Sequence, residues 1–102
     1  MLARWIWIYA LRDPKTFQMH YIGRTGHPER RFSQYRCHQY PYRQSARATP
    51  IHQWLRKLHQ RKKQPIIQIL AWTTQFNGKP LERQYIQQAF RHGEKLLNRR
   101  DM

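Results

Sequence analysis

Apolar residues near the start of the chain gather in two short runs that a turn separates. Residues 5–11 (WIWIYAL) are apolar, aromatic and β-branched, and residues 19–24 (MHYIGR) resume a strand pattern. Between the runs stand Asp13 and Pro14, which favour the first and second positions of a turn. The pattern therefore predicts a β-hairpin.

The middle of the chain carries the signals of two helices. Pro28 suits the first turn of a helix, where its missing N–H costs nothing, and residues 29–39 are compatible with one. Thr49 and Pro50 form the strongest helix start, with Thr as the N-cap, and Pro65 is expected to end that helix. The apolar residues between them share one helical face: Ile51, Trp54, Leu55 and Leu58.

A third strand and a last helix follow. Residues 66–72 (IIQILAW) predict the strand, and Asn77 and Gly78 predict a turn after it. Pro80 is expected to open the last helix and Gly93 to cap its end. Its buried face is expected to consist of Leu81, Tyr85, Ala89 and Phe90.

These elements predict a single α/β domain over residues 1–102, with a small, mainly antiparallel three-stranded sheet flanked by helices. The order is β-β-α-α-β-α, without repeats or an internal boundary. No apolar run approaches the ~20 residues that span a bilayer, so we expect no membrane insertion. The one cysteine, Cys37, excludes an internal disulfide and fits a reducing compartment, and we expect a cytoplasmic protein.

The charge balance points to a polyanionic partner. Twenty Lys and Arg residues stand against five Asp and Glu residues, which gives a formal net charge of +15. The repulsion among so many positive charges weakens the fold unless a polyanion offsets it, and nucleic acid is the most common polyanionic partner. An anionic membrane surface is the rival partner, but no long helix combines a basic face with a continuous apolar face. Charge alone does not choose between DNA and RNA.

Five segments form a pattern that carries chemistry. Residues 7–9 (WIY) and 21–23 (YIG) lie on the two hairpin strands, and Arg31 follows ten residues after the second tyrosine. Glu82 opens the last predicted helix, and Asn98 comes after it. Each piece alone is weak, but their order and their placement on these predicted elements are specific together.

In these residues the chain resembles the GIY-YIG nuclease family. The resemblance covers residues 6–98 and departs from the motif at Trp7, where the family has Gly. It implies the GIY-YIG nuclease fold and an endonuclease that hydrolyses DNA phosphodiester bonds with the help of Mg²⁺ (or Mn²⁺).

The resemblance also implies a role for each matching residue. Glu82 is the expected metal ligand, because Mg²⁺ keeps several waters and takes few protein carboxylates. Arg31 is expected to clamp the phosphate with two parallel hydrogen bonds. Tyrosine can relay a proton from water, and the expected general base is Tyr9, with Tyr21 orienting it; the reverse assignment is the alternative. The expected catalytic set is Tyr9, Tyr21, Arg31, Tyr35, Glu82 and Asn98.

Nucleic-acid contacts are expected from basic and aromatic side chains near these positions. Arg24 directly follows the YIG triplet and is a candidate phosphate contact, and the loop 40–48 interleaves tyrosines with arginines, which suits stacking on unpaired bases. A plain solvated loop is an equally good interpretation. The expected nucleic-acid-binding residues are Arg24, Arg30, Arg36, Tyr42, Arg43 and Arg47.

Two other functions compete with the nuclease. A non-catalytic, basic nucleic-acid-binding protein would keep the fold without the chemistry, and a basic RNA-associated protein explains the charge but not the motif. Family members often carry a separate DNA-reading domain, for which 102 residues leave no room. We expect DNA as the partner, branched or single-stranded DNA included. Without such a domain, specificity for a DNA substrate is expected to come from the basic surface, DNA shape, a homo-oligomer or a targeting protein.

Overall fold

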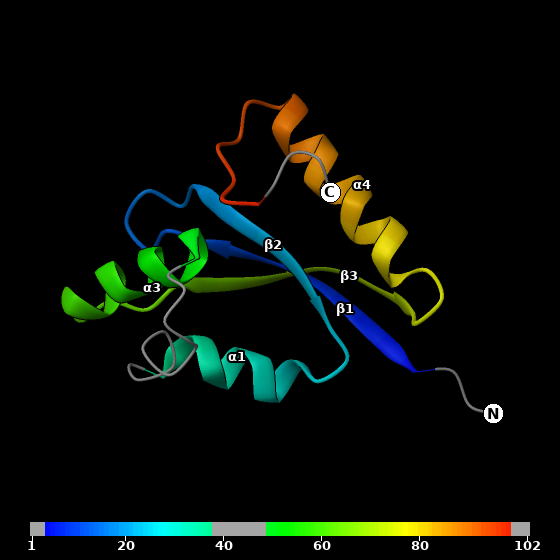
Figure 1. The fold of residues 1–102 in the computed structure, drawn as a ribbon, viewed down its shortest axis with the longest axis horizontal. Helices are drawn as coiled ribbons and strands as arrows, with labels where there is room; N and C mark the ends of the chain where they lie inside the picture. The colour runs from blue at the N-terminus through cyan, green and yellow to red at the C-terminus, as the bar shows by residue number, and fades with distance from the viewer. Residues whose placement is uncertain (1–3, 38–48, 99–102) are drawn as a thin grey trace.

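The computed structural model describes residues 4–37 and 49–98 and has the expected order β-β-α-α-β-α (Figure 1). Its sheet comprises β1 (Trp5–Arg12), β2 (Met19–Thr25) and β3 (Ile66–Thr74), in the spatial order β2-β1-β3. Both pairings are antiparallel. Since β1 is central, β2 and β3 each keep one edge that no other strand of the described residues covers.

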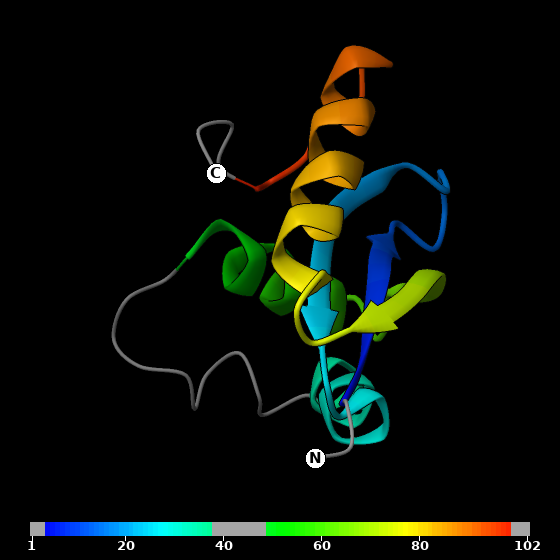
Figure 2. The same ribbon diagram turned by 90° about the vertical axis from the view of Figure 1, so that its right-hand side faces the viewer.

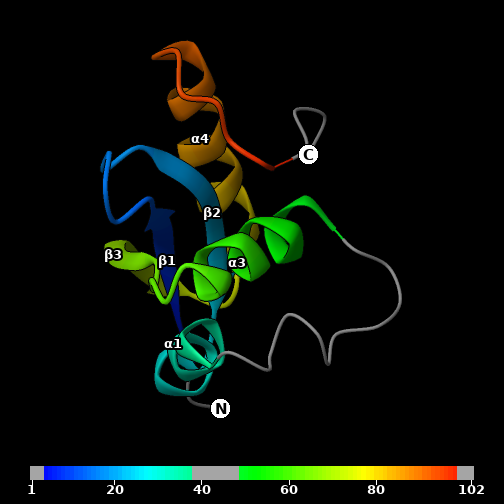
Figure 3. The same cartoon turned by 90° about the vertical axis from the view of Figure 1, so that its left-hand side faces the viewer.

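Within residues 4–37 and 49–98, three helices cover the two faces of this sheet. They are α1 (Pro28–Arg36), α3 (Pro50–Gln60) and α4 (Gly78–Arg91). Figures 2 and 3 view the molecule from opposite sides and show α4 on one side of the strands and α3 on the other. Helix α1 lies on the α3 side, near the end of the sheet where β2 runs out. No helix within the described ranges is long and apolar enough to cross a membrane.

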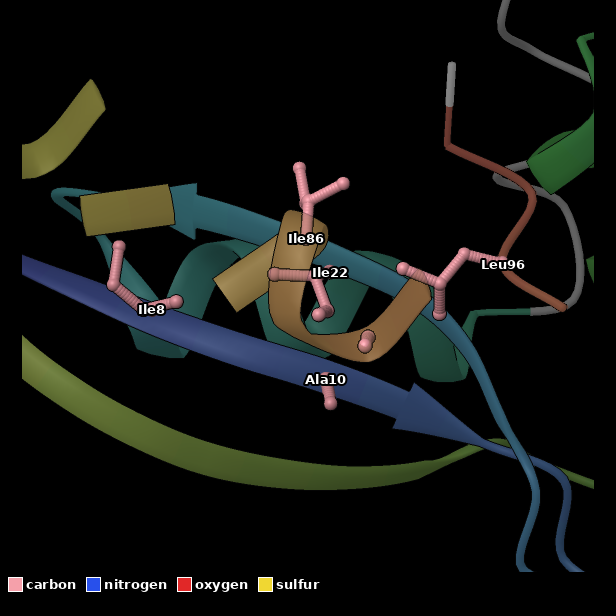
Figure 4. Packing of buried hydrophobic residues seen from close by; sticks show 6 residues of the cluster. Ile8, Ala10, Ile22, Ile86 and Leu96 are labelled. Atoms are coloured by element: carbon pink, nitrogen blue, oxygen red, sulfur yellow. The ribbon is translucent and has the colours of Figure 1, made fainter. Parts of the chain in front are cut away.

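The core is divided between the two faces because successive strand residues point in opposite directions. On the α4 face, side chains from β1 and β2 pack against the helix and the segment after it (Figure 4): Ile8, Ala10, Ile22, Ile86, Ala89 and Leu96. On the other face, β1 packs against α1 and α3 through Tyr9, Leu11, Tyr35 and Leu55. The six largest fully buried side chains of the two clusters are at most 2 % exposed, so solvent is excluded from the core on both faces.

The last helix starts earlier than predicted. Helix α4 begins at Gly78, with Asn77 as its N-cap, rather than at Pro80. Pro80 is tolerated inside the first turn because the first four N–H groups of a helix have no partner within it. Gly78 lies so close to Ile6 that an added Cβ would come within 3.0 Å of that side chain. The close contact favours glycine at this position.

The buried face of α4 also differs from the prediction. Its buried residues are Gly78, Glu82, Ile86 and Ala89, whereas the predicted Leu81, Tyr85 and Phe90 are only partly buried along its flanks. The shift brings a carboxylate onto the face that packs against the sheet. Gly93, with a φ of 85°, ends the helix as predicted, and Glu94 N–H closes the turn on the carbonyl of Ala89.

Helix α3 follows its prediction at the start but not at the end. The Thr49 side chain accepts a hydrogen bond from the His52 backbone N–H, as expected for an N-cap. The helix ends at Gln60, before Pro65, because Lys62 adopts a left-handed conformation with a φ of 58°. Pro65 instead stands directly before β3.

Candidate functional site

A buried group of aromatic side chains occupies the α1 side of the sheet. Tyr9, in the central strand, is 2 % exposed, and its hydroxyl lies 2.5 Å from the hydroxyl of Tyr35. The ring of Phe32 packs edge-on against Tyr9, with centroids 5.3 Å apart. Since Phe32 and Tyr35 are both on α1, this cluster fixes the helix against the sheet.

Two further residues of the predicted site lie within electrostatic range of Tyr9. Burial strongly raises the pKa of Tyr9, and the neighbouring Tyr35 hydroxyl raises it further. Tyr21 adds to the upward shift of the pKa, while the positive charge of Arg31 opposes it. The structure thus brings Tyr9, Tyr21, Arg31 and Tyr35 together, and Tyr9 keeps its proton at any ordinary pH.

Gly23 is the position where the hairpin makes room for Tyr9. The two residues are direct cross-strand partners, and an added Cβ at Gly23 would lie 2.5 Å from Tyr9 Oη and 2.7 Å from Tyr9 Cζ. It would also come within 3.0 Å of Tyr21 Cε2. The glycine of the YIG triplet is therefore required by the close approach of a phenol ring and not by an unusual backbone conformation.

We expect Gly23→Ala to destabilise the fold by about 1–3 kcal/mol, because the buried Tyr9 ring has to move. Adding Tyr9→Phe should restore part of the loss, since it removes the closest atom. Gly26→Ala is the matched control, because its Cβ would come no closer than 3.6 Å to Ile6 Cδ1. Chemical denaturation measures all three variants. Equal stability of the Gly23→Ala and Gly26→Ala proteins would contradict the packing of Tyr9 on Gly23.

An ion pair stands on the opposite face of the same strand. Arg24 Nη1 donates to Glu82 Oε1 at 2.6 Å, and Glu82 is 8 % exposed. The carboxylate lies in the first part of α4, where the positive end of the helix dipole favours a negative charge. A cavity of about 200 Å³ surrounds the pair, lined by Arg24, Lys79, Glu82, Arg83 and Ile86.

A second cavity begins at the next residue of β2. It has a volume of about 190 Å³ and is lined by Thr25, His27, Arg30, Arg31 and Gln34. Because neighbouring strand residues point to opposite faces, Arg24 faces the Glu82 cavity and Thr25 faces the Arg31 cavity. The end of β2 therefore separates a carboxylate-bearing pocket from an arginine-bearing pocket. A larger cavity of about 620 Å³ beside the hairpin turn contains none of the predicted site residues.

The Asn98 side chain forms hydrogen bonds with the outer edge of β2. Its Oδ1 accepts a hydrogen bond from Ile22 N–H at 2.9 Å, and its Nδ2 donates to the Ile22 carbonyl at 2.8 Å. The preceding residue, Leu97, donates from its backbone N–H to the carbonyl of His20 at 2.7 Å. The segment after α4 thus pairs with the first half of this edge, at His20 and Ile22. In the second half, Arg24 and Thr25 line the two cavities.

We expect Asn98→Ala to lower the free energy of unfolding by about 1–3 kcal/mol, because it leaves two partly buried backbone groups of Ile22 without their partner. The amide hydrogen of Ile22 should also exchange faster. Asn77→Ala is the control, since the Asn77 side chain is exposed and its hydrogen bond to Thr74 is long, at 3.5 Å. Unchanged exchange at Ile22 would show that the pairing with Asn98 does not exist in solution.

The residues around Glu82 suit a divalent ion that takes few protein ligands. Among residues 4–37 and 49–98 no group of three or more His, Cys, Asp or Glu side chains could hold a metal. Mg²⁺ commonly takes one or two carboxylates and completes its shell with waters and phosphate oxygens. Arg24, Lys79 and Arg83 line the same cavity as Glu82, and their positive charges disfavour a cation there. The cavity therefore suits a divalent ion only together with a phosphate, whose negative charge offsets them.

Several lining residues were not foreseen from the sequence. Lys79 stands three residues before Glu82 on α4, and Gln34 three residues after Arg31 on α1, so helical spacing could have suggested both. His27 carried no signal beyond its place before Pro28. Of the predicted nucleic-acid contacts, Arg24 bonds to Glu82, Arg30 lines the Arg31 cavity, and Arg36 is exposed at the end of α1. Tyr42, Arg43 and Arg47 lie outside the described residues.

Comparison with known proteins gives one match. No curated protein and no solved structure matches the chain. The model of the T5orf172 domain matches residues 6–98, which run from the second residue of β1 to Asn98. This domain occurs in nuclease-associated proteins, so it indicates a nuclease-like or DNA-binding function. Because the match covers nearly the whole sequence, the chain belongs to the T5orf172 domain family.

Proposed function

We propose that this protein is a divalent-metal-dependent endonuclease of the GIY-YIG type, which hydrolyses DNA phosphodiester bonds at the end of β2. One observation carries the proposal. Consecutive residues of an edge strand, Arg24 and Thr25, line two pockets that contain Glu82 and Arg31. A DNA strand that crosses the edge here would meet an arginine on one side and a carboxylate on the other.

Arg31 is the proposed clamp on the scissile phosphate. Its guanidinium is always charged and can donate two parallel hydrogen bonds to phosphate oxygens. Arg30, in the same cavity, adds a second positive charge. Fixed donors of this kind lower a barrier most where negative charge grows in the transition state.

Burial supports Tyr21 rather than Tyr9 as the residue that handles the attacking water. Tyr9 is 2 % exposed, bonded to Tyr35 and held in its protonated form. Tyr21 is partly exposed and beside it. In this assignment Tyr21 Oη takes a proton from the water as its own proton passes to solvent. Tyr9 and Tyr35 position the Tyr21 ring and do not touch the substrate.

Glu82 is the residue that would hold the divalent ion. When bound, the ion supplies Lewis acidity to the phosphate and its leaving oxygen. Arg24 neutralises the carboxylate in the free protein. Since the Arg24 side chain is partly exposed to solvent, it can exchange this contact for a phosphate oxygen as DNA arrives.

The same ion pair favours a second function. A carboxylate that stays bonded to Arg24 would leave a non-catalytic, basic DNA-binding protein with this fold. The formal charge of +15 serves such a protein equally well. The two functions separate on whether the bound DNA is cut.

The deciding experiment incubates the protein with supercoiled, linear, branched and single-stranded DNA and with RNA, in Mg²⁺, Mn²⁺ or a chelator. We expect cuts in DNA with either metal and intact DNA in the chelator. DNA that is bound but uncut in every condition would support the binding protein instead. Preferential binding of RNA would contradict both.

A further inference from the structure

Three tryptophans lie on one face of the sheet, at the end where β1 begins and β3 ends. Trp7 of β1 pairs directly with Trp72 of β3, and Trp5 stands two residues before Trp7 on the same face. Trp72 is 65 % exposed and Trp5 is 56 % exposed, while Trp7 between them is partly buried. We call Trp5, Trp7 and Trp72 the tryptophan face. It lies where β1 begins and β3 ends, at the right of Figure 1.

An irregularity in β3 puts Trp72 on this face. Ile8 pairs with Ala71 but Tyr9 pairs with Ile69, so β3 carries one extra residue at this point. Such a bulge switches which residues of a strand share a face. Trp72 therefore points to the same side as Tyr9 and α1 and not towards α4.

The tryptophan face continues into the arginine pocket. Thr25, which lines the cavity of Arg31, is the cross-strand partner of Trp7, and Trp7 in turn pairs with Trp72. Neighbouring strands are about 4.8 Å apart, so this row of three residues spans about 10 Å. A strand whose phosphate sits at Arg31 has its adjoining nucleotides within reach of the tryptophan rings.

The charge of the molecule decides which partner fits this face. A second copy of the chain would bring another +15 against the first. The partner must be anionic and must also offer flat apolar groups to the exposed rings. Unpaired nucleotides do both, because each base has a face that stacks on an aromatic side chain and each phosphate carries a negative charge.

We propose that the tryptophan face is a stacking platform for unpaired bases next to the cleavage site. The protein then prefers DNA with a single-stranded segment, such as a branch, a flap or an overhang, because paired bases cannot open onto the rings. This proposal rests on the proposed function for the position of the phosphate. Base stacking itself requires neither the metal nor cleavage.

The test compares Trp72→Leu with Phe76→Leu by equilibrium binding in a chelator. Phe76 is 73 % exposed and lies beyond β3, so its replacement removes an equally exposed ring outside the tryptophan face. The probes are a thymidine oligonucleotide of about 20 nucleotides, longer than a typical single-strand site, and a duplex of the same length. Thermal unfolding checks that both variants are folded.

We expect Trp72→Leu to weaken single-strand binding about tenfold or more, with duplex affinity and the salt dependence unchanged, since no phosphate contact is lost. Single-stranded DNA should quench the tryptophan fluorescence of the wild type more than that of the variant. Phe76→Leu should match the wild type.

Three results would overturn the platform. One is equal single-strand affinity for Trp72→Leu and Phe76→Leu. Another is a wild-type dimer in sedimentation that Trp72→Leu dissociates, which would assign the face to a second copy. The third is binding of vesicles rich in anionic lipid that competes with single-stranded DNA and depends on Trp72. If DNA is still cut in any of these cases, the proposed nuclease function stands without the platform.

Discussion

Replacing Glu82 by Gln is expected to abolish DNA cleavage while DNA binding persists or tightens. Gln has nearly the same shape, so the packing of this 8 % exposed residue against the sheet is kept. What is lost is the carboxylate charge that would hold the divalent ion, whose Lewis acidity is worth several kcal/mol of barrier. At about 1.4 kcal/mol per tenfold, this corresponds to a rate loss of roughly 10³-fold or more. DNA binding should not suffer, because Arg24 becomes free to contact phosphate.

The control for this prediction is Glu94→Gln. Glu94 is another of the five acidic residues, but it stands after α4, away from the cavity around Glu82. Single-turnover nicking of supercoiled DNA and equilibrium binding are measured for both variants and the wild type. Nicking by the Glu82→Gln protein at the wild-type rate would remove Glu82 from the site.

The second large effect is expected at Arg31. Arg31→Ala should raise the barrier by about 2.7–4 kcal/mol, or roughly 10²–10³ in rate, by analogy with the loss of one oxyanion donor. DNA affinity should fall only slightly, because 19 other Lys and Arg residues remain of the 20 in the chain. Arg31→Lys should not restore the rate well, since an ammonium group cannot form the planar pair of hydrogen bonds.

Arg61→Ala is the matched control for Arg31. Arg61 is exposed at the end of α3 and lines a cavity that contains none of the predicted site residues. If Arg31→Ala cleaves DNA as fast as Arg61→Ala, or if its whole defect is weaker binding, Arg31 is only a part of the basic surface.

The fold was largely predictable because the local signals agree with the global arrangement. The hairpin, the Thr49 cap, the Gly93 cap and the order of elements all follow from the sequence and are confirmed by the structure. The predicted start of α4 at Pro80 was wrong by two residues, because the helix begins at Gly78. Gly78 lies against Ile6, a contact far away in the sequence that no local pattern contains.

The arrangement of the site was less predictable. The sequence pattern placed Tyr9 and Tyr21 on paired strands, but it did not show that Tyr9 would be sealed under α1 and Gly23 would lie beneath its ring. It suggested Arg24 as a phosphate contact without its partner Glu82. Both features depend on how the helices pack onto the sheet, and spacing along the chain does not determine that packing.

The tryptophan face illustrates the same limit in a strand. Alternation alone would put Trp72 on the same side as Leu70, which packs against the α4 cluster. The extra residue in β3 reverses this and leaves Trp72 beside Trp7. A bulge has no reliable signature in a run such as IIQILAWTT, so the face appears only in the structure.

The central claim is that the two pockets on either side of β2 form one site around a single phosphate and a single ion. Paramagnetic broadening of backbone amide signals by Mn²⁺, in the presence of a non-cleavable DNA, tests it most directly. We expect broadening both at Glu82 and Arg24 and at Thr25 and Arg31, and its loss from all four in the Glu82→Gln protein. Broadening that stays on the α4 side alone, or that persists unchanged in Glu82→Gln, would contradict it.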